Sequence, residues 1–243
     1  MAVTLKTVVL DSEKCIGCIT CMRRCPTEAI RIENGKAKIL YDKCINCGEC
    51  VRSCKGGAKR PVYDSFDLVA SYKYKIALPS PSLFGQFNNL DDPNYVIEGL
   101  LALGFDEVFE VGLAAELVTD CTKKLMENKD LVRPVISTAC PAVAELILLK
   151  FHELADHMLP VYAPAKIAAK LAKKQALEKG VPADDIGIFF ISPCPAKVYS
   201  LHKEEVSETK YISGVLSQSD IYFRLVDKMN KIKNPRKLGK CGY

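Results

Sequence analysis

The stretch from Cys15 to Cys54 contains one cysteine pattern twice. The first copy reads Cys15-Ile-Gly-Cys18-Ile-Thr-Cys21-Met-Arg-Arg-Cys25-Pro26. The second reads Cys44-Ile-Asn-Cys47-Gly-Glu-Cys50-Val-Arg-Ser-Cys54-Lys55. In both copies the four cysteines are separated by two, two and three residues. A tight loop with three thiols lets backbone amides wrap the sulfurs, so the repeat predicts two metal-binding loops related by a rough twofold axis.

This spacing is the ligand pattern of a bacterial-type ferredoxin with two 4Fe-4S clusters, in which the fourth cysteine of each run binds the other cluster. By that rule the ligands of cluster 1 are Cys15, Cys18, Cys21 and Cys54. The ligands of cluster 2 are Cys25, Cys44, Cys47 and Cys50. Such a module is too small to bury much apolar surface, so we expect the clusters to supply its cross-links.

Zinc and disulfides are the competing explanations for these cysteines. A zinc ribbon uses isolated Cys-x2-Cys pairs separated by a strand or helix, rather than three cysteines in seven residues followed by a fourth. A disulfide framework is typical of small secreted chains, whereas this chain has 243 residues and no secretory signal at Met1–Lys6. We therefore favour clusters, and expect a reducing cytoplasm that is low in oxygen.

The net charge of +5 first raises the possibility of a nucleic-acid partner. Residues 1–60 hold 12 Lys/Arg and 6 Asp/Glu, a surplus of 6, so the remainder sums to about −1. Two clusters with their thiolates, each of charge about −2 or −3, would more than cancel this surplus. We expect no nucleic-acid site and, with no run of about 18 apolar residues, no membrane span. A basic patch of Arg23, Arg24, Lys55, Lys59 and Arg60 remains available to an acidic redox partner.

The chain predicts an α+β protein, in which a two-cluster ferredoxin domain (1–60) and a linker (61–73) precede an α/β domain (74–243) with a mostly parallel sheet. Asn34-Gly35 predicts a hairpin between strands 30–32 and 38–40. Residues 55–61 are interpreted as part of the linker and 64–74 as a short docking helix. Strands are expected at 1–10, 75–78, 107–111, 134–138, 186–192 and 212–216. Helices are expected at 93–103, 114–128, 142–151, 164–179 and 218–228.

Two further cysteines follow predicted strands. Cys140 follows the strand 134–138, and Cys194 follows the strand 186–192, each before a proline. Ligands of open α/β sheets bind beyond the carboxyl ends of the strands, so both thiols are expected to face one site, with Lys197 able to donate to an anionic ligand. The alternative is that each is an ordinary buried cysteine.

With these residues the chain resembles the iron-only (FeFe) hydrogenases, from the ferredoxin domain to Tyr243. Ser137-Thr138-Ala139-Cys140-Pro141 resembles the first H-cluster motif, and Pro193-Cys194-Pro195-Ala196-Lys197 resembles the second. Leu103-Gly104-Phe105-Asp106-Glu107-Val108-Phe109 is similar to a segment that precedes the first motif. The resemblance implies that Cys140 and Cys194 bind the 4Fe-4S part of an H-cluster and that Lys197 hydrogen-bonds a cyanide of its diiron part.

The chain departs from the pattern of catalytic members. Ala139 stands where they have a proton-transferring cysteine, Ser200 stands where a carboxylate of the proton path is usual, and residues 79–87 lack the family's glutamates. Proton delivery needs groups of suitable pKa. Similar losses mark the sensory members. The family's third motif, with two more cysteines, has no match here, and Cys241 does not fit it. We expect no complete H-cluster on this chain alone, whether it is a fragment, a truncated product or part of a split protein.

The expected function is iron-sulfur electron transfer in a protein of the iron-only hydrogenase type, a sensory or truncated relative with little hydrogen turnover. Its partner would be a redox or signalling protein, and hydrogen a ligand. The alternatives are an active ferredoxin-linked hydrogenase subunit, which interconverts H2 with two protons and two electrons, and an interaction module that lost its cofactor. We assign no catalytic residue. Cys121 and the histidines are expected to have no role in a metal site, and no nucleotide-binding motif occurs.

Overall fold

The computed structural model describes residues 6–88, 90–203 and 211–241. These residues fall into two compact units, each built from three separate stretches of chain. The first unit comprises Met1–Tyr63, Asp130–Pro160 and Cys194–Glu208. The second comprises Asp64–Lys129, Val161–Pro193 and Thr209–Tyr243. No helix within the described ranges is both long and apolar enough to cross a membrane.

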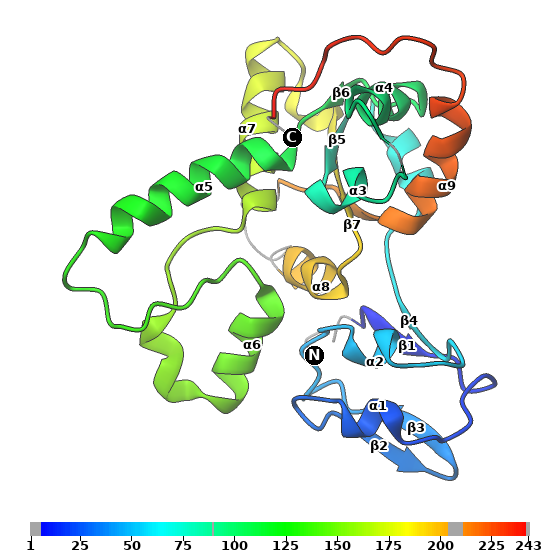
Figure 1. The fold of residues 1–243 in the computed structure, drawn as a ribbon, viewed down its shortest axis with the longest axis vertical. Helices are drawn as coiled ribbons and strands as arrows, with labels where there is room; N and C mark the ends of the chain where they lie inside the picture. The colour runs from blue at the N-terminus through cyan, green and yellow to red at the C-terminus, as the bar shows by residue number, and fades with distance from the viewer. Residues whose placement is uncertain (1–5, 89, 204–210, 242–243) are drawn as a thin grey trace. The chain divides into compact units, whose positions relative to one another are not determined.

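The ferredoxin module, residues 6–63, consists of two copies of one 29-residue unit. Its elements are β1 (Val8–Leu10), α1 (Thr20–Arg23), β2 (Ile30–Glu33), β3 (Lys36–Ile39), α2 (Glu49–Arg52) and β4 (Lys59–Pro61). The antiparallel pair β1–β4 matches Val8 with Pro61. Adding 29 to the residue number of Val8 gives Ala37, and subtracting 29 from that of Pro61 gives Ile32. These two residues are partners in the antiparallel pair β2–β3. The module therefore has the expected internal twofold symmetry (Figure 1).

The same period appears in the backbone of the cysteine loops. Three residues of the first copy have positive φ, Gly17, Ile19 and Glu28, and so do their counterparts 29 positions later, Asn46, Gly48 and Gly57. L-residues rarely adopt this left-handed conformation. The loops therefore share one backbone path, which is dictated by the need to turn the amides inward rather than by side-chain preference.

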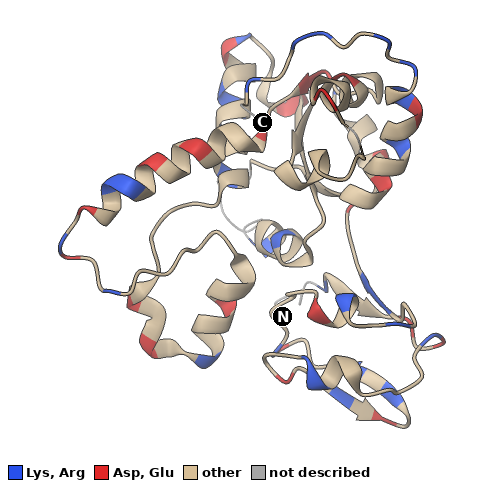
Figure 2. Cartoon of the chain, viewed as in Figure 1, with Lys and Arg blue, Asp and Glu red and all other residues tan. Residues whose placement is uncertain are grey.

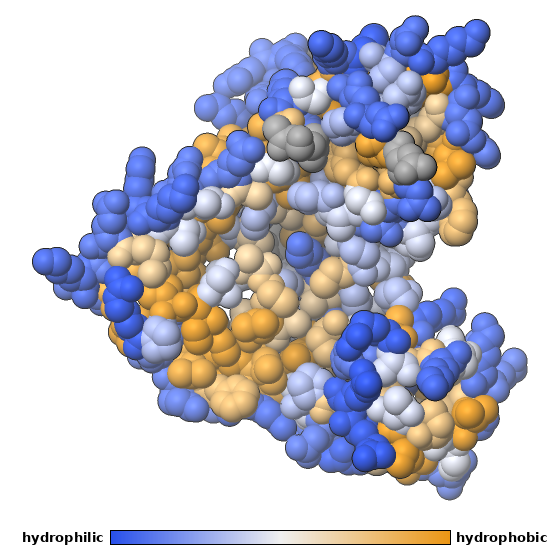
Figure 3. All heavy atoms as spheres, in the orientation of Figure 1, coloured by the Kyte–Doolittle hydropathy of each residue, from blue (hydrophilic) through white to orange (hydrophobic). Residues whose placement is uncertain are grey.

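The rest of the first unit is mainly helical. It contains α6 (Pro141–Lys150), the 3-10 helix η2 (His152–His157) and α8 (Pro195–Lys203). Helices α6 and α8 pack against each other, and Lys203 Nζ lies 2.8 Å from Glu145 Oε1 across that contact. Hydrophobic residues gather on the surface over α6 (Figure 3): Leu148, Leu149 and Phe151 are all exposed.

The second unit is built around a parallel four-stranded sheet of order β6-β5-β7-β8. Its strands are β5 (Tyr74–Pro79), β6 (Glu107–Val108), β7 (Ile186–Ser192) and β8 (Gly214–Ser217). All seven residues of β7 are buried, as expected for a central strand covered on both faces. Smaller elements of this unit are η1 (Phe66–Ser71), α3 (Pro81–Phe84) and η3 (Ala183–Asp185).

Helices cover both faces of this sheet (Figure 1). On one face, α4 (Asn94–Ala102) and α9 (Gln218–Met229) pack together and share a core with Ala77, Phe189 and Leu216. On the other, α7 (Pro164–Glu178) contacts β5 and β7 and pairs with α5 (Val111–Met126). Buried alanines give α7 a narrow face that approaches the sheet closely: Ala165, Ala168, Ala169, Ala172 and Ala176.

The predicted fold class is confirmed, and three local predictions were wrong. Residues 134–138 are not a strand of the sheet: only Ile136 forms a bridge, to Met158, because this segment belongs to the first unit and the sheet to the second. Lys59–Pro61 is strand β4 rather than linker. The segment 107–111 holds a strand of only two residues, since α5 already begins at Val111. The predicted strand 1–10 is observed at Val8–Leu10, while residues 1–5 lie outside the described part of the chain.

Candidate iron-sulfur sites

The cysteine loops direct backbone amides at the sulfur atoms. The amide of Ala29 donates to Cys25 Sγ at 3.2 Å, and the amide of Ala58 donates to Cys54 Sγ at 3.2 Å. These bonds are equivalent under the 29-residue repeat. The amide of Ala37 also donates to Cys15 Sγ, at 3.3 Å. Hydrogen bonds to the cysteine sulfurs are among the features that tune iron-sulfur clusters, whose ligands are thiolates.

The structure brings the four predicted ligands of cluster 2 around one cavity. Its lining includes all four of these thiols, together with apolar groups from β1 and the second half of the hairpin; the thiols are Cys25, Cys44, Cys47 and Cys50. Cys25 reaches this cavity from the other repeat. The donor set therefore fits the crossed ligand arrangement of a two-cluster ferredoxin. Of the predicted cluster 1 ligands, Cys15 and Cys21 are buried with Ile30 and Ala58, the partly buried Cys54 packs against them beside Cys25 and Cys50, and Cys18 is exposed.

Hydrogen bonds and burial shift the pKa values of these thiols in opposite directions. The bond from Ala37 lowers the pKa of the Cys15 thiol, and bonding to Thr20 lowers that of Cys18. Burial raises the pKa of Cys44 and Cys47 and takes that of Cys50 to about 12. Burial disfavours the charged form of an acid. Burial likewise raises the pKa of Cys21 in the first loop, so buried thiols of both loops would need bound iron to stabilise the negative charge of the thiolate.

Two buried polar atoms support the presence of a further group in the module. Ser53 Oγ and Lys59 Nζ are shielded from solvent and have no hydrogen-bond partner in the part of the chain that the structure describes. Native proteins seldom leave such atoms unpaired unless an ion or water completes them. Within the described ranges, no three His, Cys, Asp or Glu side chains converge on a single metal ion. A 4Fe-4S cluster binds each thiolate at a separate iron atom, so its ligands need not converge on one point.

Cys140 and Cys194 occupy equivalent positions in two helix starts. Each directly precedes a helix whose first residue is proline, α6 for Cys140 and α8 for Cys194. The Cys140 carbonyl accepts from the amides of Val143 and Ala144, and the Cys194 carbonyl accepts from those of Lys197 and Val198. The positive end of a helix dipole favours an anionic group at such a position. Cys140 is exposed and Cys194 half-buried, and Lys197 is half-buried in the first turn of α8.

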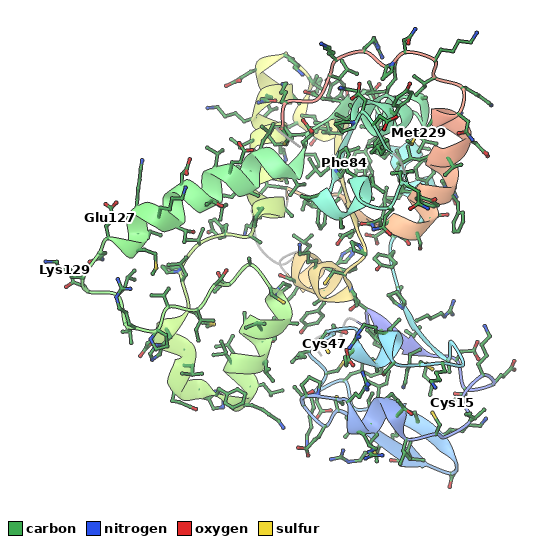
Figure 4. The ribbon with its side chains drawn as sticks, in the orientation of Figure 1. Cys15, Cys47, Phe84, Glu127, Lys129 and Met229 are labelled. Atoms are coloured by element: carbon green, nitrogen blue, oxygen red, sulfur yellow. The ribbon has the colours of Figure 1, made fainter. Side chains whose placement is uncertain are left out.

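The turn that carries Cys194 contacts the second cysteine loop of the module. A Cβ placed on Gly48 would lie 3.0 Å from Pro195 Cγ, so this glycine allows the close approach. Thr7 Oγ1 donates to the Pro195 carbonyl at 3.0 Å in a buried hydrogen bond. Burial, together with the nearby Cys194 thiol, raises the pKa of Tyr63 to about 12. Figure 4 labels Cys47 in the second cysteine loop and Cys15 in the first.

The comparison with family models decides the family. The model described as "Iron only hydrogenase large subunit, C-terminal domain" matches residues 73–234. The chain belongs to the iron-only hydrogenase family. A second model, a 4Fe-4S dicluster domain, matches residues 7–55. The resemblance read from the motifs is thereby confirmed, as is the iron-sulfur nature of the ferredoxin module.

Curated relatives match this hydrogenase-family chain over part of their own length. The periplasmic Fe hydrogenase large subunit of Nitratidesulfovibrio vulgaris is 26% identical over 227 residues, which cover 84% of this chain and 53% of that protein. Ferredoxin-2 of Desulfomicrobium norvegicum is 52% identical over 31 residues, which cover 13% of this chain and 52% of that protein. The chain thus spans about half the length of these relatives.

Among solved structures, an FeFe-hydrogenase from Chlamydomonas reinhardtii matches with a TM-score of 0.53 and 19% identity, over 67% of this chain and 45% of that chain. A second FeFe-hydrogenase structure matches with a TM-score of 0.54 and 20% identity, over 66% and 44% of the two chains. These likenesses show that the family fold is shared.

Sequence reasoning missed three residues around these sites. Lys59 was expected in an exposed patch, but only 3% of its surface is exposed, because the first residue of β4 points inward. Arg23, Arg24, Lys55 and Arg60 are exposed as predicted, and Figure 2 shows Lys and Arg along the module. Thr7 and Tyr63, which adjoin the Cys194 turn, carried no sequence signal. The hydrogen bond from Thr7 to Pro195 joins residues that are distant in the sequence, so it depends on tertiary structure.

Proposed function

We propose that this chain is an iron-sulfur electron-transfer protein of the iron-only hydrogenase type, with little hydrogen turnover of its own. The observation that carries the proposal is the contact of Gly48, which lies between Cys47 and Cys50, with Pro195, which follows Cys194. The second cysteine loop of the module therefore adjoins the second H-cluster-type motif. When bound, 4Fe-4S clusters supply one-electron carriers.

The chain's own residues hold these groups in the proposal. Cys15, Cys18, Cys21 and Cys54 would bind cluster 1, and Cys25, Cys44, Cys47 and Cys50 would bind cluster 2. Cys140 and Cys194 would hold the 4Fe-4S part of an H-cluster at the starts of α6 and α8, with Lys197 donating to an anionic ligand. We propose no ligand role for Cys241, whose amide donates to Glu110 within the second unit.

Low turnover is inferred from the residues beside the ligands. Ala139 has no titratable group, and its amide donates to Ser137 Oγ at 3.3 Å. The hydroxyl of Ser200 does not ionise near neutral pH, so it cannot serve as a general acid or base in the way a carboxylate does. A role in sensing hydrogen or redox state, with a redox or signalling protein as partner, follows from this deficit. We also place the protein in the cytoplasm, which cell fractionation followed by immunoblotting checks.

The cofactor proposal is tested by anaerobic reconstitution of the full chain with iron and sulfide. We expect about eight iron and eight sulfide per chain, and an EPR signal from two interacting clusters after reduction. One or two zinc ions in place of iron would refute it.

A second candidate function is hydrogen turnover, which the family match over residues 73–234 favours. The test is a hydrogen assay on protein produced with the family's maturation enzymes, with Ala139→Cys as the matched variant. We expect negligible rates from the native chain and, where infrared bands of bound CO and cyanide show a matured site, a gain of about 10²- to 10⁴-fold in the variant. Fast turnover by the native chain would overturn the sensory proposal.

A further inference from the structure

The two copies of the ferredoxin repeat differ at one buried position. Ile30 opens β2 and Lys59, 29 positions later, opens β4. Ile30 is paired with Ile39 and Lys59 with Leu10, and these pairs are equivalent under the repeat. Ile30 and Lys59 are both almost fully buried, with 2% and 3% of their surface exposed. The second copy therefore places an ammonium where the first places a hydrocarbon.

Among the described residues, none forms a hydrogen bond with the Lys59 ammonium. Long lysine side chains commonly bury their stem and extend the charged end to water, but Lys59 Nζ is shielded from solvent by the described part of the chain, with which it makes no hydrogen bond. The described salt bridges of the module are formed by other lysines and arginines, such as Lys38 with Glu33. A buried unpaired charge is strongly unfavourable, so this arrangement needs a negative group close by.

The thiols around Lys59 belong to both predicted ligand sets. Its charge acts on Cys15 and Cys21 of the first set and on Cys44 and Cys50 of the second. For Cys21 and Cys50 it is the largest influence that opposes the rise in pKa caused by burial. Lys59 is therefore within electrostatic reach of thiols of both sets.

We propose that Lys59 is the shared internal counter-charge of the two clusters, donating hydrogen bonds to cluster sulfur and raising the reduction potentials of both. The inference rests on the proposed function, because it requires that the clusters bind. Reduction adds one negative charge to a cluster, and a fixed positive charge in a dry interior stabilises that product more than the oxidised form. Hydrogen bonds to sulfur act in the same direction.

The test is a redox titration of the reconstituted full chain, followed by EPR, for four variants. Lys59→Met removes the charge and keeps the length, Lys59→Gln keeps a donor without the charge, and Lys59→Arg keeps both. Lys55→Met removes the same charge from an exposed position whose influence is on Cys18 and where solvent ions screen it.

We expect Lys59→Met to lower the reduced-to-oxidised ratio of both clusters at least tenfold at a fixed potential, a shift of about 59 mV for one electron. Lys59→Gln should fall between Lys59→Met and the native chain. Lys59→Arg and Lys55→Met should stay within about threefold of the native chain. A shift confined to one cluster, or ratios in Lys59→Met within threefold of native, would overturn the inference.

Loss of cluster assembly is also decisive. If Lys59→Met and Lys59→Gln fail to bind iron but Lys59→Arg binds about eight, the positive charge is required and the proposal stands. If all three fail, the site demands the shape of lysine and the proposal falls. A native chain that binds no iron refutes the proposed function itself, which the iron and sulfide content shows before any titration begins.

Discussion

The ferredoxin module and the helix starts at Cys140 and Cys194 both carry cysteines that we propose as metal ligands, but they position these cysteines differently. The module collects eight cysteines from 40 residues of chain, and its two loops repeat one backbone path with the same period. The second region takes one cysteine from each of two helix starts that lie 54 positions apart. Ligands that are close in sequence are positioned by the loop itself, whereas ligands that are far apart depend on helix packing. The two regions should therefore respond differently to mutation.

The largest contrast is expected from removing one thiol in each region. Cys47→Ala should lose about four of the eight iron atoms and much of the module's stability, because bound metal contributes directly to the folding of so small a core. Cys194→Ala should keep the eight iron atoms of the module. Iron and sulfide content, with circular dichroism for folding, measures both. An equal loss of iron in the two variants would show that the two regions share one metal site, which would contradict the difference proposed between them.

The next effect concerns the contact that joins the two regions. Thr7→Val removes the hydrogen bond to the Pro195 carbonyl and leaves that buried oxygen without its donor. We expect the free energy of unfolding to fall by about 1–3 kcal/mol, measured by urea denaturation of the reconstituted protein. Thr119→Val serves as the control, since this hydroxyl bonds within the exposed surface of α5 and its loss should cost less than about 0.5 kcal/mol. Equal costs would mean that the contact with Pro195 contributes nothing specific.

A smaller effect is expected within the second region. Glu145→Gln removes the ion pair with Lys203 that links α6 and α8. The pair is partly exposed, so the loss should be about 0.2–1 kcal/mol and should shrink as salt is added. The bond from Lys203 to Glu145 raises the pKa of the lysine, so the variant should also lower that pKa, as measured by NMR titration. Asp120→Asn, which breaks a fully surface-located pair with Lys123, is the control. A salt-independent loss would contradict an electrostatic link.

The smallest effect at neutral pH is expected at Tyr63. Its pKa is raised to about 12 in the folded protein, against an ordinary value of 10.0. As pH rises from about 10 to about 12, the unfolded chain releases this proton and the folded chain retains it, so stability should fall across that window. Tyr63→Phe should match the native chain at pH 7 and lose less stability above pH 10. Chemical denaturation at several pH values measures the free energy of unfolding of both proteins. An identical decline of this free energy in both would contradict the raised pKa of Tyr63.

The sequence predicted those features that are encoded locally. The cysteine spacing, the Asn34-Gly35 hairpin and the apolar strand of β7 each depend on a few neighbouring residues, so their patterns could be interpreted without tertiary information. Residues 134–138 have the composition of a strand, but the unit in which they lie does not contain the sheet. Composition cannot distinguish these cases, because the partner strand decides the outcome.

For the candidate site, the ligand roles inferred for Cys140 and Cys194 from short motifs stay predictions. The structure places both cysteines before proline-started helices that pack together. The buried position of Lys59 was not predictable from its charge. The burial of Lys59 can be inferred once the strand pairs are known. In these pairs β4 is the counterpart of β2, so Lys59, the first residue of β4, points inward as Ile30 does.

The strand pairing of the module has a consequence for how it unfolds. Each ladder joins a strand of one repeat to a strand of the other, and each predicted ligand set takes its fourth thiol across the same boundary. A 29-residue half excised from the chain would expose two unpaired strand edges and three thiols lacking a fourth, and would regain both only by associating with a second copy of itself. The smallest unit that folds cooperatively is thus a pair of repeats. The module should therefore unfold in one transition rather than one loop at a time.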